Sequence, residues 1–187
     1  ARELGVGGAI HEALADEREG HGQLAGRVHL AEHEVGDVQN LATLIVDPDG
    51  RGLESHWQKT SQALLVGVIL HALYKAANEG TAATLPAVDA LLADPERDVA
   101  ELWMEMRTYG HVEGQNHPAV GSAARDMMDR PDEEAGSVLS TAKSYLAVYR
   151  DPVVARNVSK SEFRIRDLMH HEQPVSLYIL TQPNDKA

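Results

Sequence analysis

The chain has 187 residues, of which 43% are hydrophobic, 25% are charged and only 4% are aromatic, and it contains no cysteine. This length and composition suit one folded domain, or a domain with part of another, and the scarcity of aromatic residues disfavours a β-sandwich or β-barrel. Without cysteine there is no disulfide, thiolate nucleophile or iron–sulfur cluster, and a net charge of −12 disfavours general coating of nucleic acid.

The first segment, residues 1–33, differs from the rest of the chain. It contains six glycines among Ala, Glu and Arg and has no sustained apolar period. We therefore expect a poorly ordered or unassigned lead-in, and we assign it no chemistry. The chain also begins without Met and stops shortly after an apolar run, which suggests a piece of a longer protein.

Residues 34–150 predict a mainly α domain of about five to six helices. Apolar residues at spacings of three and four from Val35 to Ile45 indicate an amphipathic helix, and the turn of residues 47–50 follows it. A long helix is predicted from Leu53 to Asn78, with Gly80 as its left-handed stop. Its middle is apolar nearly all round but shorter than the roughly 20 residues that span a bilayer, so we expect a buried central helix.

Four further helix starts carry Pro, and two of them also carry acidic residues, which suit the first turn of a helix. The predicted stripes place Leu102, Trp103 and Met106 inward, and likewise Met127 and Met128. These starts are Pro86, Asp94-Pro95-Glu96, Pro118 and Pro131-Asp132-Glu133-Glu134. The last helix should end at Asp151-Pro152 and bury Val138, Leu139, Ala142, Tyr145, Leu146 and Tyr149.

The tail, residues 151–187, is predicted to be a connector followed by one strand, Val175–Thr181, between Pro174 and Pro183. A single strand is not stable alone. We therefore expect it to belong to the sheet of an α/β domain that the chain does not contain.

Ten histidines raise a metal hypothesis, which has two candidate groups. His29 and His33 would share a helix face but lack convergent ligands, and His170-His171-Glu172 presents adjacent side chains that point apart. We therefore favour solvent-exposed histidines over a metalloenzyme and expect no metal site. His71 is expected at the edge of the core with a local hydrogen bond.

The methionines and one local group of basic residues each allow a plain, structural interpretation and a functional one. The methionines of residues 104–128 are more often core fillers than an adaptable binding surface. The local basic strip is either a solvated connector or a contact to DNA or to an acidic neighbour. It consists of Arg156, Lys160, Arg164 and Arg166.

Several stretches resemble the coupling proteins of type IV secretion in conjugation, the TraG/TraD-like group. The resemblance runs from about Glu34 to the last residue. Its segments are residues 34–42 (EVGDVQNLA), 52–60 (GLESHWQKT), 137–142 (SVLSTA), 149–152 (YRDP) and 177–186 (LYILTQPNDK).

This resemblance implies a membrane-anchored, hexameric, RecA-like ATPase at the cytoplasmic face of the bacterial inner membrane. Such proteins deliver a relaxase–DNA complex or effector proteins to the secretion channel. Residues 34–150 would be their inserted all-α domain, and the strand would re-enter the nucleotide-binding domain. The ATP-binding and Mg²⁺-binding motifs of the family are absent here, so we expect no catalytic, cofactor or metal residue and no ATP turnover in this chain.

The charge balance indicates which partner the all-α domain would meet. From Glu34 onward there are 14 Lys and Arg residues against 23 Asp and Glu residues. We therefore expect relaxase or relaxosome proteins and channel components as partners, with single-stranded DNA possible. The candidate recognition residues are Asp132, Glu133 and Glu134, together with the basic strip. The alternative is a stand-alone helical DNA-binding or regulatory protein whose strand pairs in a dimer.

Overall fold

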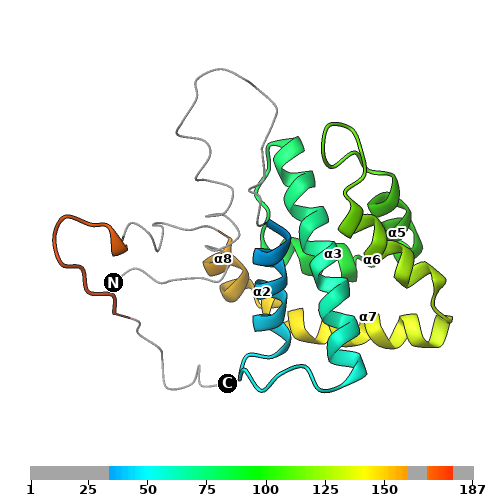
Figure 1. Cartoon of the computed structure of the whole chain (residues 1–187), viewed down its shortest axis with the longest axis horizontal. Helices are drawn as coiled ribbons and strands as arrows, with labels where there is room; N and C mark the ends of the chain where they lie inside the picture. The colour runs from blue at the N-terminus through cyan, green and yellow to red at the C-terminus, as the bar shows by residue number, and fades with distance from the viewer. Residues whose placement is uncertain (1–33, 160–167, 179–187) are drawn as a thin grey trace.

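The computed structural model describes residues 34–159 and 168–178, and within them the protein is helical (Figure 1). The prediction of a mainly α domain is confirmed, because six α-helices lie between residues 34 and 150. In chain order the elements are α2 (Glu34–Val46), α3 (His56–Glu79), α4 (Leu85–Ala93), α5 (Val99–Thr108), α6 (Pro118–Asp129), α7 (Asp132–Leu146), the 3₁₀ turn η1 (Ala147–Arg150) and α8 (Pro152–Val158). None of the helices in this described part is long and apolar enough to cross a membrane.

Helix α3 is the centre of the bundle. Every residue from Leu64 to Tyr74 is buried, and α2, α4, α6 and α7 all pack against this helix. Ser55 begins α3 with a capping box, in which its hydroxyl accepts from the backbone of Gln58 and the Gln58 side chain accepts from the backbone of Ser55. Gly80 ends it in the left-handed conformation at φ 69°, as predicted. The predicted start at Leu53 was three residues early.

The predicted start of α5 was wrong. Asp94 caps the C-terminus of α4 and accepts the backbone N–H of Glu96 at 2.9 Å, which closes a turn instead of starting a helix. Asp98 is the true N-cap, and its carboxylate accepts from Ala100 at 3.0 Å. Asp94 and Asp98 are each followed within three residues by a Glu, so the local sequence does not distinguish the two as helix starts.

The inward stripes are largely as predicted, with one correction at α6. Leu102, Trp103, Met106 and Met127 are buried, whereas Met128 is 40% exposed. Helix α7 buries Val138, Ala142 and Leu146, as predicted. Leu139 and Tyr145 in α7 and Tyr149 in η1 are only half-buried. The plain interpretation therefore holds for Met106 and Met127, which are core residues, but not for Met128 or for Met104, which is 48% exposed.

The tail differs most from its prediction. Asp151 ends η1 and also caps an unpredicted helix, α8, by accepting from the backbone of Val153 at 2.7 Å. Val175 to Tyr178 are exposed and form no strand, so the strand prediction is wrong for these residues. Residues 179–181, the rest of that prediction, lie outside the described residues. A strand is stable only when it pairs with neighbouring strands. The described residues contain no sheet that could supply them.

Candidate recognition surface

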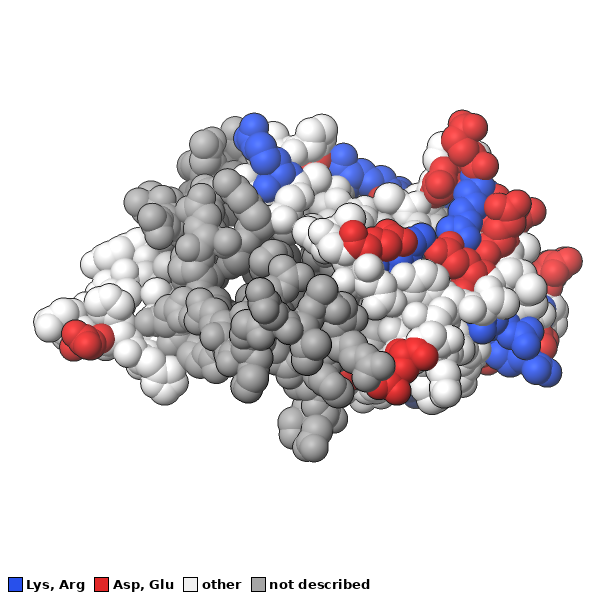
Figure 2. Space-filling model, turned by 90° about the horizontal axis from the view of Figure 1, so that it is seen from above, with Lys and Arg blue, Asp and Glu red and all other residues white. Residues whose placement is uncertain are grey.

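Acidic side chains gather where α6 ends and α7 begins. Pro131 separates the two helices, and five acidic residues lie within nine positions of the chain. We call this group the acidic corner; its members are Asp126, Asp129, Asp132, Glu133 and Glu134. Figure 1 places the α6–α7 junction at one end of the bundle, and Figure 2 shows acidic side chains, with a few basic ones among them, over that same end. This end of the domain therefore presents a negative surface.

Ion pairs with Arg130 neutralise part of the negative charge of the acidic corner. Arg130 contacts both Asp126, at 2.6 Å, and Glu134. Glu134 is half-buried and also lies 3.2 Å from Nε2 of His56 at the start of α3. Glu134, predicted as a recognition residue, is therefore held by two partners within the bundle.

Asp132 and Glu133 differ from Glu134. Both are exposed in the first turn of α7, and neither has an ion pair among the described residues. Pro131 gives α7 no side-chain cap, so these carboxylates also face the positive end of the helix dipole. They remain the acidic positions of the predicted set that a partner can reach.

The predicted basic strip lies elsewhere. Arg156 is exposed on α8, which packs on α4 and η1 at the opposite end of the bundle from the α6–α7 junction (Figure 1). Lys160, Arg164 and Arg166 lie outside the described residues. The structure therefore does not bring Arg156 and the acidic corner together.

A buried polar network that the sequence did not reveal joins α2, α3, α5 and the α5–α6 loop. His71 on α3 is fully buried, and its Nδ1 lies 2.9 Å from Nε2 of His111 in the loop. The prediction of a core-edge histidine with a local hydrogen bond is thus wrong, because the partner is 40 residues away. Its Nε2 faces Oε1 of Glu105 at 3.5 Å and has no full hydrogen bond in the described part.

The hydrogen-bond donors around the network decide where its protons sit. The backbone N–H of His117 donates to Nδ1 of His111 at 3.2 Å, so His111 carries its proton on Nε2 and donates to His71. His71 then carries its proton on Nε2, toward Glu105. His117 accepts the N–H of Ala119 at Nδ1, so its own Nε2 proton faces Glu34 at 3.3 Å. These contacts fix the tautomers of His71 and His111, and the Nε2–H of His71 has only the long contact to Glu105.

Burial supports the neutral forms of His71 and His111. Burial, followed by the neighbouring His71 and His117, lowers the pKa of His111 to about 4. Burial likewise lowers the pKa of His71, against the opposing effect of Glu105. Burial alone would raise the pKa of Glu105, but hydrogen bonds from Lys75 and Arg97 lower it to about 2. The network therefore places the neutral rings of His71 and His111 near the ionised carboxylate of Glu105. These contacts link α3, α5 and the α5–α6 loop.

Neither metal candidate gains support. His29 and His33 lie outside the described residues, and His170 and His171 are exposed, with His171 accepting only from the nearby backbone of Gln173. Across residues 34–159 and 168–178, no group of three or more His, Asp or Glu side chains could hold a metal ion. Nothing in the sequence pattern signals the His71–His111–His117 network, because its members come from separate segments.

Comparison with known proteins gives one consistent result. Residues 28–187 match the family described as Type IV secretory system Conjugative DNA transfer. Two relatives from Escherichia coli, both named Conjugal transfer protein TraG, are 86% and 81% identical to this chain over 156 residues. That alignment covers 83% of this chain and 25% and 24% of the relatives, so the chain spans about a quarter of their length. No solved structure matches it.

Proposed function

The chain belongs to the type IV secretory system conjugative DNA transfer family, and we propose that its helical bundle recognises a basic protein surface of the transfer substrate, such as that of a relaxase. Its close similarity to two conjugal transfer proteins supports a place in this process. The observation that carries the proposal is the acidic corner, where exposed Asp132 and Glu133 have no ion pair within the described part. Opposite charge on a partner would speed encounter and fix orientation.

The proposal extends to the longer proteins that this chain resembles. In them, the bundle would meet substrates at the cytoplasmic face of the inner membrane and hand them to a hexameric ATPase motor and the secretion channel. ATP and Mg²⁺ would bind outside this segment, so we expect no ATP turnover from the chain alone.

The alternative of a stand-alone DNA-binding or regulatory protein has less support. It requires a strand that pairs in a dimer, and Val175 to Tyr178 form none. The high identity to conjugal transfer proteins also favours the first proposal.

Charge reversal at the acidic corner tests the proposal. We expect Asp132→Lys with Glu133→Lys to slow association with the cognate relaxase by about tenfold, because the encounter loses electrostatic attraction. Glu134 is left unchanged, since its reversal would also break the contacts with Arg130 and His56. Association rates from surface plasmon resonance would measure the effect.

The matched control reverses two exposed acidic residues in the first turns of other helices, Asp37→Lys on α2 and Glu101→Lys on α5. It changes the net charge by the same amount. Equal slowing in both double variants, or no slowing in either, would remove the acidic corner from the proposal.

A further inference from the structure

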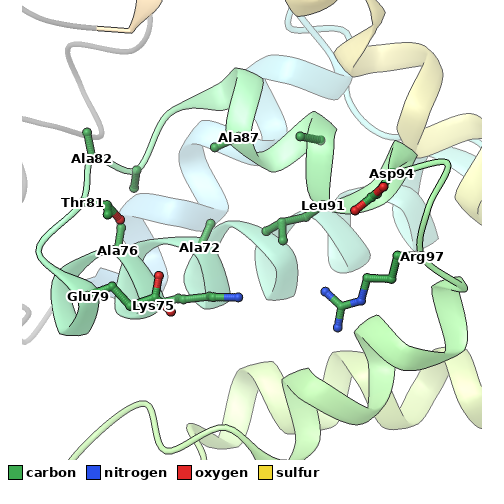
Figure 3. A pocket seen from close by; sticks show the side chains of 12 residues that line it. Ala72, Lys75, Ala76, Glu79, Thr81, Ala82, Ala87, Leu91, Asp94 and Arg97 are labelled. Atoms are coloured by element: carbon green, nitrogen blue, oxygen red, sulfur yellow. The ribbon is translucent and has the colours of Figure 1, made fainter.

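A groove of about 250 Å³ lies between the C-terminal half of α3 and helix α4 (Figure 3). Small side chains leave this space open: Ala72 and Ala76 on α3 face Ala87 on α4, with Leu91 beside them. The floor of the groove is therefore apolar, and the small side chains that form it leave the space above them open. An apolar side chain from outside would lose its water contacts there.

The two basic residues of the groove share one carboxylate. Lys75 on α3 and Arg97 before α5 both bind Glu105, at 2.6 and 2.5 Å. Figure 3 shows the Lys75 and Arg97 side chains pointing toward each other from the two sides of the groove. One carboxylate offsets one of the two positive charges, so this group keeps one net positive charge, on side chains that are only partly exposed.

The acidic residues of the groove are not neutralised. Glu79 and Asp94 are exposed at its two ends, and neither has an ion pair within residues 34–159 and 168–178. Asp94 accepts only the backbone N–H of Glu96. Together with Lys75, Arg97 and Glu105, these two carboxylates leave the groove with one net negative charge, and the unpaired negative charges lie at its ends.

The helix ends add to this charge. Glu79 is the last residue of α3 and Asp94 caps the C-terminus of α4, and neither helix has a basic residue in its last turn. The carbonyl groups at a helix C-terminus carry partial negative charge that favours a cation. Each end of the groove thus combines an acidic side chain with an uncompensated helix end.

We propose that the α3–α4 groove docks a partner segment in which an apolar side chain lies between two basic ones. The apolar side chain occupies the alanine-lined floor, and the basic side chains reach Glu79 and Asp94. This inference rests on the proposed function and deepens it, since it names the part of a basic partner that the bundle would hold.

Two variants of the 187-residue chain separate the apolar and the charged parts of the site. Ala90→Trp fills the groove from an exposed position, and Ala100→Trp, exposed on α5, is its control. Glu79→Gln with Asp94→Asn removes both charges while leaving an oxygen to accept the Glu96 N–H. Its control is Asp37→Asn with Glu101→Gln.

The probe is a labelled peptide with one leucine between two arginines in a Gly/Ser background, titrated by fluorescence anisotropy. We expect tenfold weaker binding of this peptide to Ala90→Trp and to the double charge variant, with less than a twofold change in both controls. A peptide with serine in place of leucine should bind at least tenfold more weakly to the parent chain. Equal binding of the two peptides, or binding unchanged in both groove variants, would overturn the proposal.

The cognate relaxase distinguishes failure of the groove from failure of the proposed function. Relaxase binding that responds to Asp132→Lys with Glu133→Lys but not to the groove variants would overturn the groove alone. If the relaxase does not bind the parent chain at all, the proposed function fails, and the peptide titration still decides whether the groove binds this class of ligand.

Discussion

Gly67 lies where α3 passes closest to α6. A methyl group at this position would overlap with the side chain of Ala123 and would also touch Met106 at 3.5 Å. We expect Gly67→Ala to lower the free energy of unfolding by about 1–3 kcal/mol, because the two helices would have to move apart. Urea denaturation of the purified chain would measure this change.

Gly136 on α7 is the matched control for Gly67. A methyl group there would meet nothing within 4 Å, so Gly136→Ala should raise the free energy of unfolding by about 0.5–1 kcal/mol through helix propensity and a stiffer unfolded chain. If Gly67→Ala were as stable as Gly136→Ala, the close approach of α3 and α6 would be wrong.

The neutral histidines make stability depend on pH. Unfolded histidines take up protons near their ordinary pKa of 6.5, whereas burial lowers the pKa of His111 to about 4 and lowers that of His71 as well. Below pH 6.5 the unfolded state thus binds more protons, and the free energy of unfolding should fall as pH drops from about 7.5 to 5, by at most about 1.4 kcal/mol per pH unit per histidine. Glu105 contributes little in this window, since its folded pKa of about 2 and its ordinary value of 4.5 both lie below it.

Denaturation curves at several pH values would measure this dependence. The double variant His71→Leu with His111→Leu should lose most of the slope even if it is less stable overall. The control His56→Gln removes a largely exposed histidine that lies outside the network, at the start of α3. Identical slopes in all three proteins would contradict the assignment of neutral buried rings.

Contacts between distant segments explain what residue-level prediction missed. The exposure of Asp132 and Glu133 follows from helical phase, because they precede the apolar stripe that begins at Val138. The half-burial of Glu134 does not follow, because it depends on His56, 78 residues earlier in the chain. The same holds for His71 and His111, whose spacing carries no periodic signal.

Helix α3 is the element on which the bundle depends. Leu65 and Ile69 are fully buried in it, among the contacts with α2, α6 and α7. Replacing either residue by Ala should lower the free energy of unfolding by about 2–5 kcal/mol, through lost burial and a remaining cavity. Lys59→Ala, at an exposed position of the same helix, should change it by less than about 0.5 kcal/mol.

Thermal or urea denaturation would compare these three variants. If Leu65→Ala and Ile69→Ala both melt within about two degrees of the parent chain, α3 is not the core of the fold.

Helix prediction succeeded where local signals were strong. Pro at the first turns of α4 and α6 and Gly80 after α3 mark boundaries that the structure confirms. It failed at α5, where Asp94 and Asp98 offer competing caps, and at α8, where Asp151-Pro152 suggested only an end. An Asp-Pro pair can follow the end of one helix or begin the next, and the sequence alone does not tell which of the two applies.

At the scale of the whole molecule, charge is unevenly distributed. The acidic corner lies at the α6–α7 junction, and Arg156 lies on α8 at the other end of the bundle. A nucleic-acid contact through Arg156 would therefore lie away from the acidic corner. The excess of acidic residues favours the protein partner.

The most direct test of a protein-recognition domain is the affinity of this chain for its cognate relaxase. Isothermal titration calorimetry at about 50 mM and about 300 mM salt would measure it, with single-stranded DNA titrated in parallel. We predict that the relaxase binds at low salt and that its affinity falls steeply at high salt, because screening weakens the attraction between opposite charges. The chain should bind single-stranded DNA far more weakly under both conditions. Binding to DNA but not to relaxase at low salt would contradict the proposed recognition of a basic protein surface.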